Sequence, residues 1–101
     1  MEYIHIKRFC DLEDEPEDTY YELDEGRHEV RRVEFFRGGP CFSYGAELGN
    51  QNLLPDTPFP KDLYQFNQVG IMEARTISSA LFQEIWQQAK QCPDGFMGLF
   101  F

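Results

Sequence analysis

The chain of 101 residues is 42% hydrophobic and 16% aromatic, and it carries a formal net charge of −9. This length predicts a single domain spanning residues 1–101, and the aromatic content argues against an intrinsically disordered chain. The negative charge argues against binding to nucleic acid or to an anionic membrane, because both would repel the protein.

The first residues and the cysteines predict a cytoplasmic protein. Residues 1–5 lack the basic and apolar regions of a secretory signal, and no apolar run approaches the ~20 residues of a membrane helix. The cysteines, Cys10, Cys41 and Cys92, are odd in number and widely spaced. That pattern is a poor disulfide framework and predicts reduced, buried thiols.

The chain starts with a predicted strand and a polar loop. In Tyr3–Phe9, Ile4 and Ile6 share one face, which is the period-two pattern of a half-buried strand. The following segment, Asp11–Asp18, is dense in acidic residues and contains Pro16. Like charges at this density oppose regular structure, so we expect a loop there.

A β-hairpin is predicted next. Its strands are Thr19–Asp24 and His28–Arg37, and Gly26 in the turn between them supplies a positive φ at low cost. Val30 is out of phase with Val33, so we expect a bulge near Arg31 and Arg32. The arginines of the hairpin are expected to pair across the strands with Glu22, Asp24 and Glu34; they are Arg27, Arg31, Arg32 and Arg37.

The middle of the chain has weaker signals. Cys41–Tyr44 is a short fourth strand, and Gly45–Pro60 is an irregular connection rich in glycine and proline. Lys61–Asn67 has the character of one or two helical turns. Glu73–Ile77 is either a short strand or an extended approach to the helix that follows, and its few cues do not decide between them.

The clearest element is a helix over Ser79–Gln91, with Ser78 as its N-cap. Its apolar stripe, at helical spacing, consists of Phe82, Ile85, Trp86 and Ala89. The apolar tail Phe96–Phe101 is expected either to fold back onto the domain or to bury against a second copy of the chain, giving a homodimer.

Together these elements predict an α+β fold, in which an antiparallel sheet of four or five strands is packed by the C-terminal amphipathic helix on one face. The predicted core consists of Ile4, Ile6, Leu23, Val33, Phe35, Phe82, Ile85 and Trp86.

Catalytic, metal and cofactor signatures are missing from the sequence. His5 and His28 are the only histidines, and neither has a partner at metal-ligand spacing. Asp11–Asp18 lacks the spacing of an EF-hand, although clustered carboxylates leave a calcium site open as an alternative. Cys41 beside His28 also remains an open pairing for nucleophilic chemistry. We therefore predict a protein that is not an enzyme and binds no metal or cofactor.

The most informative feature is a block of charge from Asp11 to Glu25, which holds nine acidic residues and no basic one. A surface of this kind attracts cationic proteins, and tyrosines beside it are typical interface anchors. A solvated loop without a partner is the alternative. The predicted partner-binding residues are Asp11, Glu13, Asp14, Glu15, Glu17, Asp18, Tyr20 and Tyr21.

Two parts of the chain resemble an uncharacterised family of small acidic bacterial proteins. One part is the acidic hairpin, Glu17–Asp24 followed by Glu25–Gly39, and the other is Glu73–Ser78 leading into Phe82–Trp86. The resemblance covers most of the chain but implies no catalytic residues. The sequence departs from the family pattern in its glycine- and proline-rich middle and in its apolar tail.

By size, charge and fold type, the chain also resembles the immunity proteins of contact-dependent and polymorphic toxin systems. This resemblance implies a cytoplasmic inhibitor that occupies the active-site cleft of a basic toxin domain, such as a nuclease, with an acidic surface. The alternative hypothesis is a homodimeric or ligand-binding module, suggested by the aromatic excess and the apolar tail.

Overall fold

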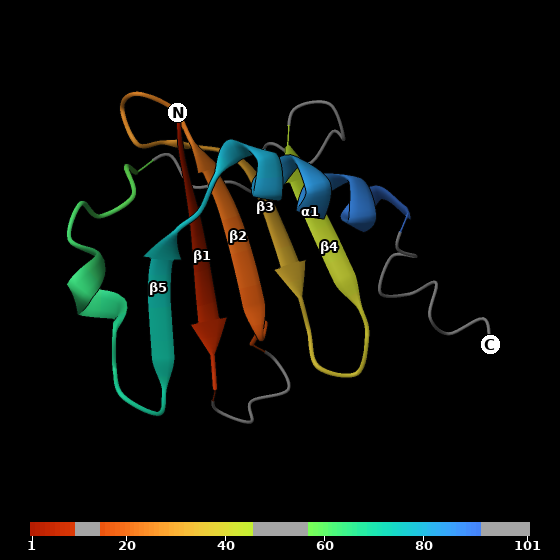
Figure 1. Ribbon diagram of the computed structural model, residues 1–101, viewed down its shortest axis with the longest axis horizontal. Coiled ribbons are helices and arrows are strands. Elements are labelled where there is room, and N and C mark those ends of the chain that lie inside the picture. The colour runs from red at the N-terminus through yellow and green to blue at the C-terminus, as the bar shows by residue number, and fades with distance from the viewer. Residues whose placement is uncertain (10–14, 46–56, 92–101) are drawn as a thin grey trace.

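The computed structural model describes residues 1–9, 15–45 and 57–91 (Figure 1). These residues form a β-sheet, a short 3-10 helix and an α-helix. In chain order the elements are β1 (Glu2–Arg8), β2 (Asp18–Leu23), β3 (Glu29–Phe35), β4 (Cys41–Gly45), η3 (Leu63–Phe66), β5 (Met72–Thr76) and α1 (Ser79–Gln91).

The five strands form one antiparallel sheet in the order β4-β3-β2-β1-β5, and α1 lies across one of its faces (Figure 1). Strands β1 to β4 are consecutive neighbours, whereas β5 comes from late in the chain and pairs with β1. The predicted α+β fold is confirmed. The segment that the sequence left undecided, Glu73–Ile77, overlaps strand β5.

The hairpin contains a bulge, as predicted, but at Val30, one residue before the expected Arg31 and Arg32. Glu22 lies opposite Arg31, but the next residue of β2, Leu23, lies opposite Glu29, so Val30 is the extra residue. Because the bulge shifts the in-and-out alternation of β3 by one residue, side chains before and after Val30 can each face the side of the sheet that suits their polarity.

The turn between β2 and β3 differs from the prediction. The positive φ lies at Arg27, with φ 65°, and not at Gly26. The Arg27 side chain is anchored, because its Nε donates to the Phe59 carbonyl at 3.2 Å and its Nη2 donates to the Pro60 carbonyl at 2.7 Å. It also pairs with Glu2. These bonds hold Arg27 in a backbone conformation that usually favours glycine.

On the helix-bearing face of the sheet, Val33 packs against the apolar stripe of α1. The helix begins after Ser78, whose Oγ accepts a hydrogen bond from the Leu81 amide at 3.1 Å, as the N-cap prediction required. Phe82 and Trp86 are buried, at 0% and 2% exposure. The cluster comprises Val33, Phe82, Trp86 and Ala89, with Tyr3, Tyr20, Phe35, Ile77 and Ile85 packed around it.

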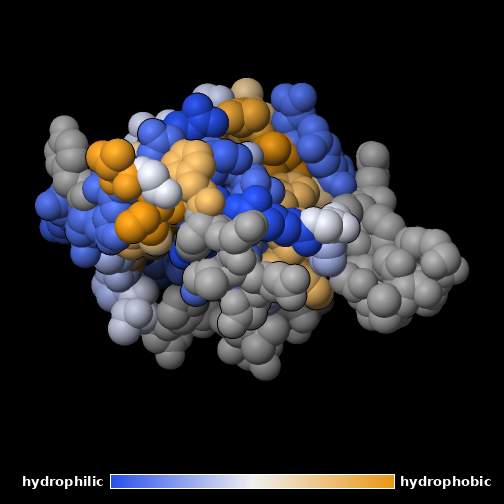
Figure 2. Space-filling model, turned by 90° about the horizontal axis from the view of Figure 1, so that it is seen from below, coloured by the Kyte–Doolittle hydropathy of each residue, from blue (hydrophilic) through white to orange (hydrophobic). Residues whose placement is uncertain are grey.

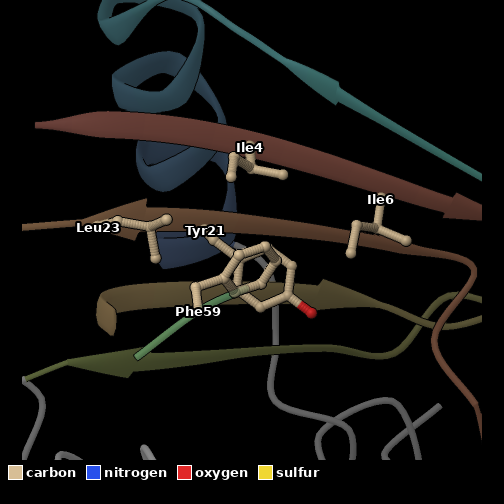
Figure 3. Packing of buried hydrophobic residues seen from close by; sticks show 5 residues of the cluster. All are labelled: Ile4, Ile6, Tyr21, Leu23 and Phe59. Atoms are coloured by element: carbon tan, nitrogen blue, oxygen red, sulfur yellow. The ribbon is translucent and has the colours of Figure 1, made fainter. Parts of the chain in front are cut away.

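The opposite face carries a second cluster, which is shown in Figure 3. It comprises Ile4, Ile6, Tyr21, Leu23 and Phe59, with Leu63, Phe66, Met72 and Ala74 packed against it. The predicted single core is therefore wrong, because its members divide between two faces of one sheet. Phe59 and η3 cover this second face, and the Phe59 amide donates to the Arg27 carbonyl at 2.7 Å.

Cys41 is buried at 2% exposure and is disulfide-bonded. The prediction of reduced thiols is wrong for Cys41, because spacing in the sequence does not tell which cysteines the fold brings together. The tail Phe96–Phe101 and most of the Gly45–Pro60 connection lie outside the described residues. In residues 1–9, 15–45 and 57–91, no helix has the length and apolar character needed to cross a membrane.

Candidate partner-binding surface

Six polar residues form two cross-strand rows on the helix-bearing face of β2, β1 and β5. In the first row His5 lies opposite both Tyr20 and Arg75, and in the second row Lys7 lies opposite both Asp18 and Glu73. Side chains directly opposite each other in antiparallel strands are close enough to interact. We call these six residues the polar grid; they are His5, Lys7, Asp18, Tyr20, Glu73 and Arg75.

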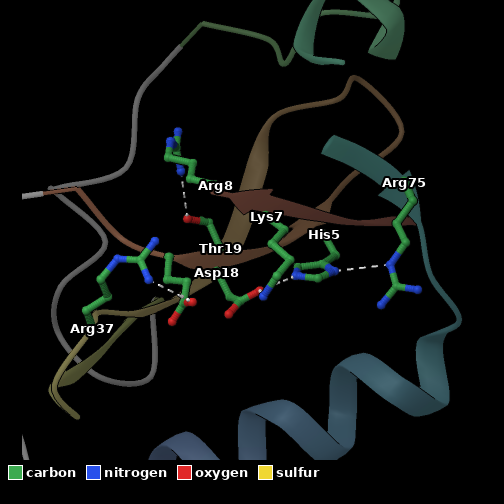
Figure 4. Close-up of polar contacts among 8 residues, drawn as sticks. His5, Lys7, Arg8, Asp18, Thr19, Arg37 and Arg75 are labelled. Carbon is green, nitrogen blue, oxygen red and sulfur yellow. Dashed lines mark hydrogen bonds and ion pairs between the residues drawn. The ribbon is translucent and has the colours of Figure 1, made fainter. Parts of the chain in front are cut away.

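His5 links the grid through both of its ring nitrogens (Figure 4). Its Nε2 donates to Asp18 Oδ1 at 2.7 Å, and its Nδ1 accepts a hydrogen bond from Arg75 Nε at 3.1 Å. Because Nδ1 accepts, the ring is neutral and carries its proton on Nε2. Lys7 Nζ also lies 3.5 Å from Asp18 Oδ1, so Asp18 is held from two sides.

The environment of His5 favours the neutral ring. Burial lowers the pKa of His5 below its ordinary value, and the positive charges of Arg75 and Lys7 lower it as well. The hydrogen bond and charge of Asp18 act in the opposite direction but do not prevail. Both ring nitrogens are committed to protein groups, so the ring serves to position Asp18 and Arg75.

The two predicted tyrosine anchors have different environments. Tyr20 is half-buried and stacks on the His5 ring, with centroids 4.3 Å apart and an interplanar angle of 4°. It also meets Phe35 edge-on at 5.9 Å. Tyr21 is only 9% exposed and packs against Phe59 in the second cluster. Tyr21 therefore packs in the core and presents little surface to a partner, and its assignment as an interface anchor stays a prediction.

The acidic residues of the predicted surface also differ in their environments. Asp11, Glu13 and Asp14 lie outside the described residues. Glu15 lies 3.8 Å from Arg8, and Glu17 lies 3.2 Å from Arg37, so both are partly neutralised within the chain. Asp18 is more deeply set, with a side chain 20% exposed. The fold thus brings Asp18 and Tyr20 together and gives Glu15 and Glu17 internal partners.

Internal ion pairs engage most of the basic side chains. They join Lys7 to Asp18, Arg8 to Glu15, Arg27 to Glu2, Arg31 to Glu22, Arg32 to Glu29 and Glu34, and Arg37 to Glu17. The expected cross-strand pairing is confirmed for Arg31 and Glu22. Arg32 and Glu34 also pair, but both lie on β3, and Asp24 approaches His28 at 3.7 Å and not an arginine.

The acidic excess has a definite distribution along the sequence. All lysines and arginines of the chain lie within the described residues. The carboxylates that lie outside them are Asp11, Glu13, Asp14, Glu47, Asp56 and Asp94. The formal net charge of −9 follows from 18 acidic residues against nine lysines and arginines.

The residues of the grid that the prediction missed are His5, Lys7, Glu73 and Arg75. Strand alternation placed His5 and Lys7 on one face, but it gave no indication that β5 would lie beside them. The sequence left a metal site open as an alternative. In the described part of the chain, no group of three or more His, Cys, Asp or Glu side chains is placed to hold a metal ion.

One family model matches the chain, over residues 2–91, and its description is a domain of unknown function (DUF6881). No curated protein matches the chain, and no solved structure matches it.

Proposed function

We propose that this chain, which belongs to the DUF6881 family, is a bacterial immunity protein that binds and neutralises a cognate toxin domain. The partner would be a basic domain, such as a nuclease, whose active-site cleft is occupied by an acidic surface of this protein. The protein itself would make or break no bonds. The observation that carries the proposal is the stretch from Asp11 to Glu25, which holds nine acidic residues and no basic one.

The distribution of charge supports a cationic partner. Three carboxylates without an intervening cation, Asp11, Glu13 and Asp14, follow directly after β1. Lys7, Arg8 and Arg37, the basic residues flanking this connection, are already paired with Asp18, Glu15 and Glu17. The sequence that a cationic surface would meet at this end is therefore rich in carboxylates and poor in cations.

The expected advantage is in the rate of association. Complementary charge steers the approach of two proteins and raises the association rate from roughly 10⁵–10⁶ to as much as about 10⁸–10⁹ M⁻¹s⁻¹ at low salt. The attraction reaches about 8 Å at physiological ionic strength, so it acts during final approach. A rapid encounter suits an inhibitor that must reach a toxin before its substrate does.

The polar grid supports the same proposal by holding its groups in place. Asp18 is fixed by His5 and Lys7, and Tyr20 is fixed by stacking on His5. Side chains that are already ordered lose less conformational entropy when a partner binds. We also propose a cytoplasmic location, because a toxin that attacks nucleic acid must be inhibited there.

The experiment uses the toxin domain encoded by an adjacent open reading frame. Asp11, Glu13 and Asp14 are replaced together by lysine, and association with the purified domain is followed by stopped flow at several salt concentrations. We expect association to be about tenfold slower or more at low salt, with the difference shrinking as salt rises. The variant should also fail to protect cells that express the domain.

A matched control carries the same change of charge elsewhere. Glu25, Asp62 and Glu84 are exposed, and Glu25 lies in the β2–β3 turn at the opposite end of the sheet from the β1–β2 connection (Figure 1). Their replacement by lysine should slow association much less. Equal slowing in both variants would show that net charge, and not the position of the carboxylates, sets the association rate. An unchanged rate after replacement of Asp11, Glu13 and Asp14 would reject the acidic surface as the binding site.

A further inference from the structure

A cluster of exposed apolar side chains lies at the end of the sheet where β1 ends and β5 begins. Val69 is 102% exposed, Ile71 is 47% exposed and Phe9 is 43% exposed. The Phe9 amide donates to the Ile71 carbonyl at 2.8 Å, so the three residues are held at one place. We call Phe9, Val69 and Ile71 the apolar tip.

The tip is built on a well-ordered turn. The amides of Ile71 and Met72 both donate to the Gln68 carbonyl, at 2.8 and 2.9 Å, and the Gln68 amide donates to the Met72 carbonyl at 2.8 Å. Gly70 supplies the positive φ, 76°, that closes the turn. Turns favour Gly, Asn, Asp and Ser, so a fully exposed valine there serves no local purpose.

A groove of about 480 Å³ runs beside the tip, along the outer edge of β5. It is lined by residues of the turn, by Phe9 and by the β5 residues Met72 to Arg75, including Glu73 of the polar grid. Figure 2, which views this end, shows hydrophobic side chains gathered on the left, the β5 side, among hydrophilic ones. An apolar centre with a polar border is the usual composition of a protein interface.

The edge of β5 is partly closed to a further strand. The Ala74 amide is occupied by Asn67 Oδ1 at 2.8 Å, and Met72 is engaged by Gln68. A partner at this edge would therefore be recognised through its side chains, which fit the tip and the groove, and not through strand addition.

We propose that the apolar tip and its groove are the contact centre for a cationic protein whose apolar side chains are bordered by lysine or arginine. This inference rests on the proposed function and specifies its interface. The argument for this occupant is charge complementarity. The sequence that continues from Phe9 is acidic as far as Asp18, and the Glu17 carbonyl, near the end of that segment, accepts from the Arg8 amide at 2.7 Å.

Charge and apolar contact have separate roles in binding. Charge acts mainly on the association rate, whereas apolar contact at the centre of an interface acts mainly on the dissociation rate. The apolar tip should therefore act on the dissociation rate, and the acidic sequence that follows Phe9 on the association rate.

The test uses two synthetic peptides of equal length and charge, one of lysine and leucine and the other of lysine and serine. Binding is measured by fluorescence anisotropy with the full chain. We expect the lysine–leucine peptide to bind more tightly. In the double variant Val69→Ser, Ile71→Ser its affinity should fall roughly tenfold, close to that of the lysine–serine peptide.

Two comparisons separate this inference from the proposed function. Phe42→Ser removes an exposed apolar residue, 37% exposed, from β4 at the other edge of the sheet, and it should retain the preference for leucine. Replacement of Asp11, Glu13 and Asp14 by lysine should weaken the binding of both peptides to the same extent.

Each other outcome has a definite meaning. If the double variant Val69→Ser, Ile71→Ser (the tip variant) still prefers the lysine–leucine peptide, while replacement of the three acidic residues by lysine (acid reversal) weakens peptide binding, the inference fails and the proposed function stands. If acid reversal changes neither peptide, both fail. If the wild type sediments as a dimer and the tip variant as a monomer, a second copy is the occupant, and the inference is overturned.

Discussion

His5 is the residue on which the polar grid depends. It accepts from Arg75 on one side and donates to Asp18 on the other, and its ring supports Tyr20. Protonation would place a hydrogen on Nδ1 and remove the acceptor that Arg75 uses. The neutral ring is therefore required for the full set of contacts.

The lowered pKa of His5 predicts that the fold loses stability in mild acid. In the unfolded chain the ring takes up its proton near its ordinary pKa of 6.5, whereas in the folded chain it does so at lower pH. The contribution of His5 is thus complete above pH 6.5 and is lost as pH falls from there to the folded pKa. Urea denaturation between pH 8 and 5 should show a slope of at most about 1.4 kcal/mol per pH unit from this one proton.

His5→Gln provides the comparison. Its amide can donate to Asp18 and accept from Arg75, but it does not titrate. We expect this variant to lose that slope, while His28→Gln, which changes the only other histidine, retains it. An unchanged slope in His5→Gln would assign the acid sensitivity to another group.

Arg32 lies between two aromatic rings on the second face of the sheet. Its guanidinium carbon is 5.6 Å from the Tyr21 centroid and 5.5 Å from the Tyr44 centroid. It also pairs with Glu29 at 2.7 Å and with Glu34 at 3.2 Å. A planar guanidinium can stack and form forked hydrogen bonds together, which an ammonium group cannot do.

We therefore expect Arg32→Lys to lower the free energy of unfolding by about 1–3 kcal/mol, although the charge is unchanged. Arg37→Lys is the matched control, because the Arg37–Glu17 pair is about one-third exposed on both sides and such pairs contribute roughly 0–1 kcal/mol. Urea denaturation of both variants measures the difference. Equal losses would show that stacking of Arg32 has no special value.

At the scale of elements, the start of α1 depends on one hydroxyl. Ser78 Oγ accepts from the Leu81 amide, which otherwise has no partner within the helix. Ser78→Ala should therefore lower the free energy of unfolding by about 1 kcal/mol. Ser79→Ala, one residue into the helix, should have little effect. Denaturation followed by circular dichroism distinguishes the two, and equal effects would refute the cap.

The elements that could be predicted from the sequence are those with a local signature. Alternation identified β1 and the β2–β3 hairpin, the phase change at Val30 identified the bulge, and helical spacing identified α1. Strand β5 was left undecided because its five residues, Met72–Thr76, show no clear alternation. Its partner, β1, is far away in the sequence, and pairing of that kind leaves no local pattern.

The candidate surface was predictable only in part, for the same reason. Acidic clustering can be read directly from the chain, but the internal pairs of Glu15 with Arg8 and Glu17 with Arg37 depend on the fold. Tyr20 and Tyr21 are adjacent and chemically alike. Tyr20 lies on the face that α1 covers, and Tyr21 lies on the face that the Phe59 segment covers. This difference in covering, which the local sequence does not reveal, buries Tyr21 and leaves Tyr20 half-exposed.

At the scale of the whole molecule, two apolar clusters share one sheet. Ile4 and Ile6 face Phe59 on one side, while Val33 faces Phe82 and Trp86 on the other. Each layer uses the same strands as its support, so neither cluster can form its contacts without the sheet. This arrangement predicts that both faces are lost in one cooperative transition, as is usual for single domains of this size.

The single tryptophan allows this cooperativity to be tested. Trp86 is 2% exposed and lies on the helix-bearing face, so its fluorescence reports on that face alone. Phe59→Leu alters the other face, where it should cost about 1 kcal/mol or more through imperfect repacking. If the sheet couples the faces, the urea midpoint measured by Trp86 fluorescence should fall as much as the midpoint measured by circular dichroism. A fluorescence midpoint that stays at the wild-type value while the other falls would mean that the two faces unfold independently.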